Sequence, residues 1–380
     1  MEAGLAIFFG LIVLYAALAV WLGRHSITMP MLFVAIGALS GAYVLNLLPF
    51  SITTKNVETL TEVTLALLLF ADASTLDFRQ VRDDAALPGR LLLIAMPLII
   101  LLGGLVALGL FPEEGIGFAL LLGAILAPTD AALGLPIFNN PRVPVRIRRA
   151  LNVESGLNDG IAAPFVTLFA ALALALATHE PGEWLMSALT EIGLAVAVGA
   201  AVGLLGGWLF AAVLKRRWTS RSAEQIGNLA LALCVFFAAK AVGGNGFIAA
   251  FVAGILFGYA TRHHLRQATE FTETSGTLLS LFVWAVFGAN LVVPLLRDFN
   301  PRAFLYALLS LTLIRMLPVA ISMAGTRMRG DTVLMMGWLG PRGLASVVFT
   351  LMALESFHLA GRPIEVLVAM AGWTILLSVL

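Results

Sequence analysis

The sequence predicts an all-helical protein that crosses a membrane thirteen times. Of its 380 residues, 60% are hydrophobic and only 12% are charged, whereas soluble domains carry about 25% charged residues. Apolar runs of roughly 20 residues, long enough as helices to cross about 30 Å of hydrocarbon, recur along the whole chain. Because these runs are evenly spread, we expect residues 1–380 to form one transmembrane unit with no soluble domain.

The boundaries of the expected spans follow the apolar runs. The spans cover residues 4–22, 28–49, 57–76, 88–111, 116–138, 149–177, 184–214, 224–242, 245–261, 272–295, 302–325, 332–356 and 363–380. No cleavage-site pattern marks the first span as a signal peptide, so we expect it to be retained. The last span reaches Leu380 without a polar flank, which suggests that a tail follows.

Basic residues alternate between loops and thereby predict the orientation. Of the 23 Lys and Arg residues, sixteen lie in or beside loops that follow odd-numbered spans: Arg24, Arg79, Arg82, Arg90, Arg142, Arg146, Arg148, Arg149, Lys215, Arg216, Arg217, Arg221, Arg262, Arg266, Arg327 and Arg329. Four follow even-numbered spans: Lys55, Arg297, Arg302 and Arg362. Since basic loops stay in the cytoplasm, we expect an outside N-terminus and a multi-pass protein of a plasma or inner membrane, of prokaryotic type.

Two spans carry helix-breaking residues in their middle. The fifth contains Ala-Pro-Thr-Asp at 127–130, and the twelfth contains Gly-Pro-Arg-Gly at 340–343. Proline removes a backbone donor, and backbone groups freed inside a bilayer are tolerated around a buried polar site. The two spans are seven apart and therefore run in opposite directions. This pattern predicts two inverted six-helix repeats, spans 1–6 and 8–13, whose discontinuous helices 5 and 12 cross at mid-membrane, with 184–214 as the connector helix.

The sixth span begins with the polar segment Asn-Val-Glu-Ser-Gly-Leu-Asn-Asp-Gly at 152–160. An ionisable group at the membrane centre costs about 3 kcal/mol or more, so a chain that keeps one there is expected to bind an ion or a proton with it. With about 1.5 Å per helical residue, Asp159 lies roughly 15 Å deep. Residues of other spans that can reach the middle of the bilayer are Asp130, Arg315 and Arg342.

Helical spacing divides the four polar side chains of this segment into two pairs. Ser155 and Asp159 are four residues apart and share one face, while Glu154 and Asn158 share a neighbouring face. We expect Asp159 to face an aqueous cavity. We expect Glu154 to form a structural ion pair, with Arg315 as its partner, because an unpaired buried charge is far costlier than a paired one.

Asp130 and Thr129 have two interpretations each, and one interpretation is favoured for three further polar residues. Asp130 can cap the second half of the fifth span or contact the ion, and Thr129 can supply oxygens to it or only repair the broken helix. Arg342 is expected to neutralise the facing C-terminal ends of the two half-helices. Asp72 and Lys240 lie near span ends, where a snorkelling acid and a peripheral lysine are favoured.

The expected site offers carboxylate, hydroxyl and backbone carbonyl oxygens, a hard-oxygen set that suits an alkali cation. The sequence has no His or Cys cluster of the kind that binds transition metals, and the single cysteine, Cys234, excludes an intrachain disulfide. The same carboxylate can hold a proton instead of the cation. If only loaded forms cross the membrane, this competition produces antiport at Asp159, with the cation and the proton as transported partners in a lipid environment. No cofactor, enzymatic reaction or nucleic acid is implied.

Three motifs together resemble one known family. Pro-Thr-Asp in a broken fifth span, the segment 152–160 in the sixth and Gly-Pro-Arg-Gly in the twelfth are similar to those of the monovalent cation/proton antiporters of the CPA1 family, the NhaP-type and sodium/proton exchanger group. The segment Gly-Asn-Gly-Phe-Ile-Ala-Ala-Phe-Val-Ala-Gly at 244–254 also resembles their ninth span. The resemblance covers nearly the whole chain.

The resemblance implies an architecture and a set of site residues. It implies a homodimer whose dimerisation side is formed by 1–80 and 224–296, and a transport core, 86–178 and 301–380, that moves against it. Asp159 is the implied cation or proton site, and the residues implied to supply or support the cation ligands are Ser155, Thr129 and Asp130. The supporting residues are Glu154, paired with Arg315, together with Arg342 and Asn158.

Two residues refine this comparison. Asn158, in place of a second aspartate, implies electroneutral one-for-one exchange in this family. Members often carry a glutamate near the end of the third span, whereas this chain has Asp72 followed by Ala73. Because an aspartate is shorter, we do not include Asp72 in the expected site.

The leading hypothesis is sodium/proton antiport, and the residues do not distinguish it from potassium/proton antiport by the same fold. A cation channel is disfavoured because no repeated filter-like segment is present. An intramembrane aspartyl protease would need Asp130 and Asp159 to share a proton, and the usual protease motifs are absent from the sequence.

Overall fold

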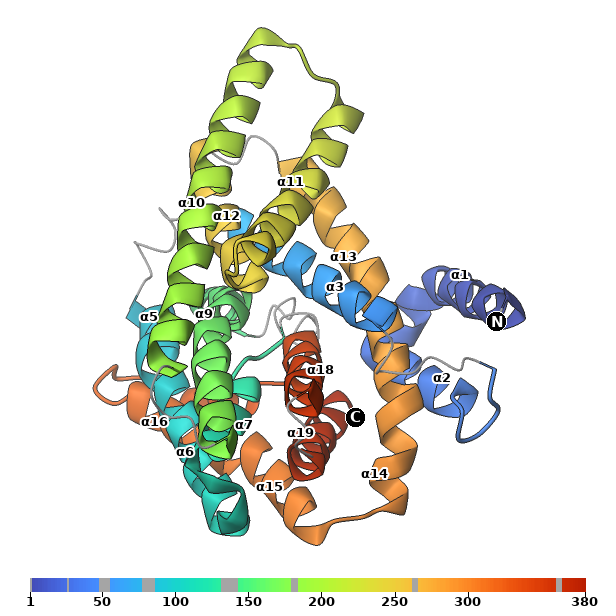
Figure 1. The fold of residues 1–380 in the computed structure, drawn as a ribbon, viewed down its shortest axis with the longest axis vertical. Helices are drawn as coiled ribbons and strands as arrows, with labels where there is room; N and C mark the ends of the chain where they lie inside the picture. The colour runs from blue at the N-terminus through green and yellow to red at the C-terminus, as the bar shows by residue number, and fades with distance from the viewer. Residues whose placement is uncertain are drawn as a thin grey trace.

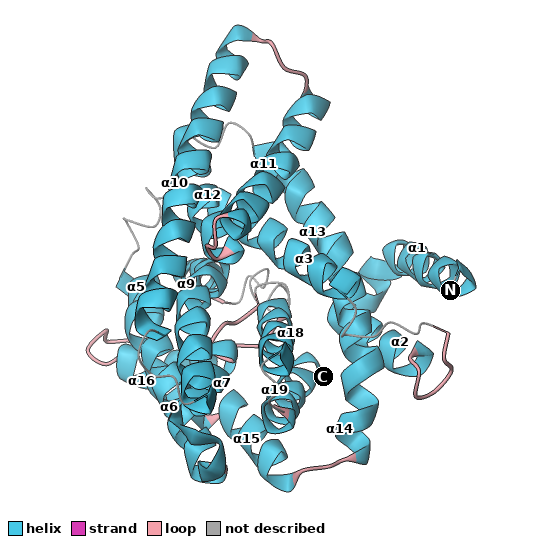
Figure 2. Cartoon of the chain, viewed as in Figure 1, coloured by secondary structure: helices cyan, strands magenta, loops and turns pink. Residues whose placement is uncertain are grey.

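The computed structural model describes residues 2–25, 27–47, 55–76, 86–130, 143–178, 184–261, 266–359 and 364–380. Five of the arginines that predict the orientation lie outside these ranges: Arg79, Arg82, Arg142, Arg262 and Arg362. Within the described ranges every regular element is a helix, as Figure 2 shows. The predicted all-helical class is therefore confirmed for this part of the chain.

The helices follow one another along the chain as in Figure 1. The first group in sequence is α1 (Glu2–Arg24), α2 (Met29–Ser40), α3 (Lys55–Ser74), α5 (Ala86–Arg90), η1 (Leu91–Ala95), α6 (Met96–Leu110), η2 (Pro112–Glu114), α7 (Gly115–Ile125) and α9 (Val145–Thr178). Next come α10 (Trp184–Arg216), α11 (Arg221–Ala241), α12 (Gly246–Thr261), α13 (Arg266–Phe287), η3 (Gly288–Val292) and α14 (Val293–Arg297). The last are α15 (Pro301–Leu311), α16 (Leu313–Ser322), α17 (Gly330–Trp338), α18 (Leu344–Leu359) and α19 (Glu365–Val379).

Seven helical segments in the described ranges are long and apolar enough to cross a membrane, and shorter apolar helices accompany them. This is the multi-pass architecture that the composition predicts, while the count of thirteen spans and the inverted repeat stay predictions. The second span is shorter than its expected range of 28–49. Its helix ends at Ser40, and the chain then turns, with Asn46 in the left-handed conformation (φ 50°) that asparagine tolerates better than most residues.

Both predicted helix breaks are present. Helix α7 ends at Ile125, and the chain runs without helical structure through Asp130. The second half of this fifth span lies outside the described residues. In the twelfth span, α17 ends at Trp338 and α18 begins at Leu344, so that Pro341 lies in the non-helical stretch between them.

A third interruption was not predicted by the sequence. The eleventh span is divided at Thr312, whose backbone (φ −113°, ψ −93°) is not helical, into α15 and α16. In a continuous helix the Ser310 carbonyl would accept the N–H group four residues later. The break frees this carbonyl, and it accepts a hydrogen bond from the Arg342 side chain instead.

The helices pack into two sets, which we name by their members. The first set contains α2, α3, α11, α12 and α13, where α3 packs against both α12 and α13. The second set contains α6, α7, α9, α15, α16, α18 and α19, in which α7 packs against α6 and α9, and α15 packs against α19. The long helix α10 packs against α12 of the first set and α9 of the second. Figure 1 shows α10 and α11 extending together beyond the other helices.

Small residues allow close packing inside the first set. Gly254 and Gly258 of α12 face the backbone of Phe70 and Ser74 in α3 so closely that a Cβ atom at either position would overlap it. Such approaches are typical of helices packed inside a membrane. They join α3 and α12 into one unit.

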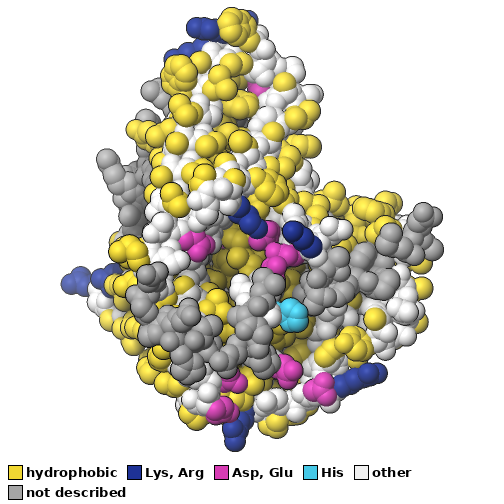
Figure 3. Space-filling model, viewed as in Figure 1, with side chains coloured by type: hydrophobic (Ala, Val, Ile, Leu, Met, Phe, Trp, Pro, Cys, Tyr) yellow, Lys and Arg dark blue, Asp and Glu magenta, His cyan; other side chains and the backbone are white. Residues whose placement is uncertain are grey.

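The outer surface of the molecule matches a lipid environment. Large apolar side chains such as Trp208, Leu205 and Val13 are more than half exposed, which is expected where the surrounding solvent is hydrocarbon. Figure 3 shows broad hydrophobic surface over the α10–α11 hairpin, and charged side chains gathered around a hollow near the middle of the same face.

Candidate functional site

Helix α9, which is long and apolar enough to cross a membrane, carries four polar residues of the predicted site. Glu154, Ser155 and Asn158 are buried, with exposed fractions of 2%, 7% and 2%, whereas Asp159 is partly exposed. The Asp159 carboxylate makes no hydrogen bond with any residue in the described ranges. Among these four side chains, Asp159 is therefore the one that combines access with oxygens that are not already engaged by the protein.

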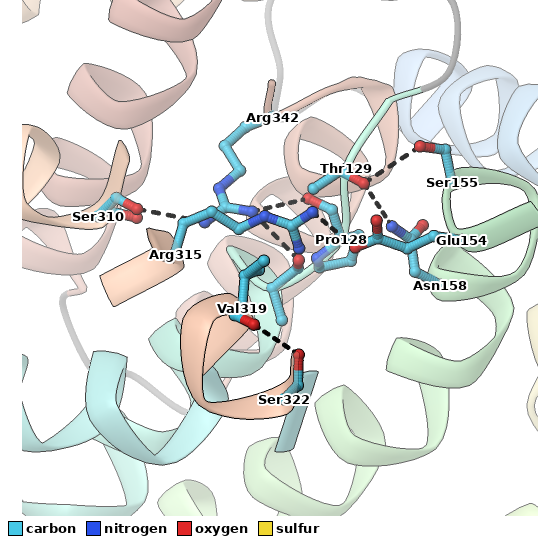
Figure 4. A network of polar contacts seen from close by, with 11 residues as sticks. Pro128, Thr129, Glu154, Ser155, Asn158, Ser310, Arg315, Val319, Ser322 and Arg342 are labelled. Atoms are coloured by element: carbon cyan, nitrogen blue, oxygen red, sulfur yellow. Dashed lines mark hydrogen bonds and ion pairs between the residues drawn. The ribbon is translucent and has the colours of Figure 1, made fainter. Parts of the chain in front are cut away.

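Thr129 links the non-helical stretch after α7 to α9, as Figure 4 shows. The Asn158 side-chain amide donates to Thr129 Oγ1 at 2.6 Å, and Thr129 Oγ1 lies 3.3 Å from Ser155 Oγ. Because Thr129 Oγ1 accepts from Asn158, its own hydroxyl hydrogen can be donated to Ser155. Lone pairs of the Ser155 oxygen then remain for another partner.

The two residues expected to form an ion pair are in contact. Arg315 Nη2 lies 2.6 Å from Glu154 Oε1, and both side chains are almost fully buried. Arg315 belongs to the first turn of α16, directly after the interruption at Thr312. The pair thus ties α9 to the broken eleventh span.

Arg342 is fully buried and binds backbone carbonyls of two interrupted spans. Its Nη1 donates to the carbonyls of Ala127 (3.1 Å) and Pro128 (3.3 Å), and its Nη2 donates to the carbonyl of Ser310 (3.3 Å). The sequence predicts a role at the half-helix ends of the fifth and twelfth spans. The structure places Arg342 at the end of the fifth span's half-helix and adds the eleventh span.

Asp130 joins the two predicted breaks. Its backbone N–H donates to the Pro341 carbonyl (2.9 Å), and its Oδ2 accepts from the Leu344 N–H at the start of α18 (3.2 Å). Asp130 therefore caps a half-helix of the twelfth span. The second half of the fifth span, one of the two partners that the sequence allows for Asp130, lies outside the described residues. A Cβ atom at Gly343 would overlap the Asp130 side chain, which explains the glycine at that position.

Two other acidic residues influence Asp159 electrostatically. Asp130 and Asp72 are both close enough to Asp159 to repel it electrostatically. Asp72, which the sequence comparison left out of the site, is thus part of its electrostatic surroundings. The described residues contain no group of three or more His, Cys, Asp or Glu side chains spaced to hold a metal ion.

Sequence reasoning missed several long-range contacts, two near the helix breaks and one between α11 and α3. The Arg342 backbone N–H donates to Ser378 Oγ, and Ser346 Oγ donates to the Ile125 carbonyl. Lys240, expected to be peripheral, donates to both carboxylate oxygens of Glu62 at 2.8 and 2.6 Å. Each contact joins residues far apart in the chain, and no local pattern indicates them.

Comparison with known proteins identifies the family. Residues 9–380 match the family described as "Sodium/hydrogen exchanger, transmembrane". The chain belongs to the sodium/hydrogen exchanger family. This confirms the resemblance that the motifs indicate, and it places the chain among transporters rather than in an enzyme class.

Curated relatives of this exchanger carry names from the same family. A "Probable Na(+)/H(+) antiporter 2" of Methanocaldococcus jannaschii is 26% identical over 329 residues, which cover 81% of this chain and 76% of the relative. The "Na(+)/H(+) antiporter ApNhaP" of Aphanothece halophytica is 25% identical, over 77% of this chain and 57% of the relative. The "K(+)/H(+) antiporter NhaP" of Alkalimonas amylolytica is 28% identical, over 65% of this chain and 42% of the relative.

A solved structure has the same fold as this exchanger. The sodium proton antiporter MjNhaP1 from Methanocaldococcus jannaschii at pH 8 superposes with a TM-score of 0.81 at 21% identity. The match covers 100% of this chain and 98% of that chain. The helical arrangement described above is therefore that of an antiporter fold.

Proposed function

We propose that this exchanger carries out electroneutral sodium/proton antiport, with the cation and the proton competing for Asp159. The observation that carries the proposal is the state of this carboxylate. It is partly exposed within the apolar helix α9 and makes no hydrogen bond to a described residue. It lies one helical turn after Ser155, whose hydroxyl is 3.3 Å from Thr129 Oγ1. Family membership and the names of the relatives support the same activity.

The cation is held by oxygens of different kinds in this proposal. The Asp159 carboxylate supplies the charge, and the Ser155 hydroxyl and the oxygens of Thr129 supply neutral ligands, the donor set that alkali cations prefer. Asp130 supports the site through the broken helix that it caps and through its negative charge. No cofactor takes part, because the cation and the proton are themselves the transported substrates.

Exchange follows from competition at one carboxylate. When Asp159 holds a proton it has no charge to offer a cation, and when it holds a cation it cannot be protonated. If the empty, charged site crosses the membrane rarely because of its desolvation cost, each cation moved one way is balanced by one proton moved the other way. The neighbouring Asn158 amide is uncharged, so the transported charge stays balanced one for one.

The conformational cycle in this proposal is alternating access. The core, residues 86–178 and 301–380, moves against a dimerisation side formed by 1–80 and 224–296 in a homodimer, with α10 as the connector. Thirteen spans in two inverted repeats and an outside N-terminus complete the arrangement in the cell membrane. The packing of the helices into two sets supports the proposal.

Potassium is the second candidate cation. Relatives named K(+)/H(+) antiporters match this chain at 28% and 31% identity, and the oxygens around Asp159 suit either ion. The choice between the two is therefore an experimental question for the same site.

Proteoliposome flux tests the proposal. Purified protein is reconstituted, a pH gradient is imposed, and proton movement is followed after addition of Na⁺, K⁺ or Li⁺. We expect Na⁺ to collapse the gradient without moving charge across the membrane, and Asp159→Asn to abolish the response. Full cation-dependent proton flux in Asp159→Asn, or a current under a voltage step, would overturn the mechanism.

A further inference from the structure

Asn245 lies where three helices meet, in the segment Gly-Asn-Gly-Phe that precedes α12. Its side-chain Nδ2 donates to Thr167 Oγ1 of α9 at 2.9 Å and to Glu191 Oε1 of α10 at 3.2 Å. Its backbone N–H donates to the Glu191 carbonyl at 3.4 Å. With an exposed fraction of 9%, the side chain is buried at this junction.

The orientation of the Asn245 amide is fixed by the helix that it caps. Its Oδ1 accepts from the N–H groups of Phe247 (3.0 Å) and Ile248 (3.2 Å) in the first turn of α12, as a capping asparagine does. Because the oxygen is held by α12, the NH₂ group must face α9 and α10. One hydrogen of the amide is available for Thr167 and the other for Glu191.

The contact with Thr167 fixes the position of α9 along the axis of α12. Six residues further along α12, the Phe251 ring lies so close to Gly160 of α9 that a Cβ atom there would overlap it. Gly160 directly follows Asp159 in the chain. The Asn245–Thr167 bond and the Phe251–Gly160 contact thus hold the helix that carries Asp159 at two levels along the same partner helix.

No other residue on the same face of α9 can replace Thr167 as a hydrogen-bond acceptor for Asn245. The residues three, four and seven positions away on either side are Gly160, Ala163, Pro164, Ala170, Ala171 and Leu174. None of them has a hydrogen-bonding side chain. If α9 moves along α12 by one turn, about 5.4 Å, the Asn245 amide loses its partner on α9 and keeps only the one on α10.

We infer that Asn245 is a positioning residue that holds α9, and with it Asp159, in one of the two transport states. The inference rests on the proposed alternating access, in which α9 belongs to the moving core and α12 to the dimerisation side. The Asn245–Thr167 hydrogen bond must then break in each transport cycle. Glu191 keeps the other amide hydrogen, so the cap of α12 stays in place while α9 leaves.

Reversible crosslinking tests whether this contact opens. Thr167 and Asn245 are both changed to cysteine in a Cys234→Ala background, which removes the exposed native thiol, and are joined by a short reducible thiol crosslinker. We expect crosslinking to reduce cation/proton exchange more than tenfold and reduction of the link to restore it. Exchange that continues in the crosslinked protein would overturn the positioning role alone.

A matched control joins two helices of the same set. Asn228 of α11 donates to Thr272 Oγ1 of α13 at 2.8 Å, so cysteines at these positions are similarly close. Both helices belong to the proposed dimerisation side, and we expect their crosslink to leave exchange unchanged. If the wild-type protein itself shows no exchange, the proposed function fails, and that outcome differs from a failure of the inference.

Single substitutions test the hydrogen bond itself. Thr167→Val removes the acceptor at nearly constant volume, whereas Thr167→Ser retains it. Since an interhelical hydrogen bond in a membrane contributes about 0.6 kcal/mol on average, its loss shifts an equilibrium by about threefold. We expect Thr167→Val to change the ratio of the apparent cation affinities on the two membrane faces by this factor, with Thr167→Ser close to wild type. Equal ratios in all three proteins would contradict the inference.

Discussion

The Asn158 amide donates to Thr129 Oγ1 at 2.6 Å and thereby fixes a hydroxyl of the broken fifth span against α9. The bond joins the two segments that carry the proposed cation ligands. It also uses Asn158 as a donor, which an aspartate in the carboxylate form at this position could not be. The neutral side chain next to Asp159 therefore has a structural task as well as a place in the proposed charge balance.

Asn158→Ala is expected to weaken cation binding more than it weakens the fold. Without the amide, the Thr129 hydroxyl is free to rotate, and the ligands are no longer held for the cation. We expect the apparent KM for Na⁺ to rise about tenfold, while thermal stability falls only slightly, because an interhelical hydrogen bond in a membrane contributes about 0.6 kcal/mol on average.

Thr129 provides the matched pair of variants for this prediction. Thr129→Val should resemble Asn158→Ala, since both lose the same bond, and Thr129→Ser should retain near wild-type flux. A Thr129→Val protein with an unchanged apparent KM would show that this hydroxyl does not organise the site.

Glu154→Gln is expected to destabilise the protein strongly. The substitution leaves the buried Arg315 guanidinium without its counter-charge, and breaking a buried pair in this way costs about 3–5 kcal/mol in soluble proteins. Thermal unfolding in detergent should show a clearly lower midpoint. The charge-swapped protein, Glu154→Arg with Arg315→Glu, should recover part of the loss, and a swap no more stable than either single variant would count against the pair as a stabilising contact.

Arg342→Lys is expected to abolish most exchange despite the retained charge. The guanidinium donates to three carbonyls at once, and a lysine ammonium lacks the planar fork that makes this geometry possible. Flux and thermal stability should both fall. The control is Arg329→Lys, because the Arg329 side chain is 84% exposed and its pair with Asp331 lies at the surface; this variant should behave as wild type.

Asp130→Asn and Asp130→Ala separate capping from charge. The asparagine keeps an oxygen for the Leu344 N–H, whereas alanine removes it, and the loss of a helix cap costs about 0.5–2 kcal/mol. We expect Asp130→Asn to fold with near wild-type stability but reduced cation affinity, and Asp130→Ala to lose both. Wild-type cation affinity in the asparagine variant would restrict Asp130 to the cap.

The pH dependence of the apparent KM follows from competition at one carboxylate. In the proposed mechanism, lowering the pH protonates Asp159 and removes the charge that binds the cation, so we expect the apparent KM for Na⁺ to rise as the pH falls. Where the site is mostly protonated, a one-proton exchange predicts about a tenfold rise for each pH unit. Initial rates in proteoliposomes across several pH values measure this slope, and a hundredfold rise for each unit would indicate two protons.

The sequence predicts the parts of this fold that have local causes. The breaks at 127–130 and 340–343 were expected because Pro128 and Pro341 interrupt apolar runs. The Glu154–Arg315 contact was expected because a lone buried charge is costly. The break at Thr312 was not expected, because Ser-Leu-Thr-Leu-Ile at 310–314 contains no proline or glycine. The Arg342 side chain that binds the freed Ser310 carbonyl comes from a different span.

The cap made by Asp130 shows the same limit within the site. An aspartate that follows a broken half-helix is a natural cap for the next residues of its own span, and the sequence favours that partner. Its side chain instead accepts from Leu344, more than 200 residues away. The residue type predicts the kind of bond, but only the crossing of two distant spans determines its partner.

The reach of Arg342 limits how the core can deform. One guanidinium holds the end of the fifth span's half-helix and the interruption of the eleventh span, while its own backbone lies in the break of the twelfth. The interruptions of three separate spans are therefore connected through a single fully buried residue. A bend at one of them would strain the other two. In the proposed alternating-access cycle we therefore expect the region around Asp159 to move as a rigid block, with the flexible positions elsewhere in the molecule.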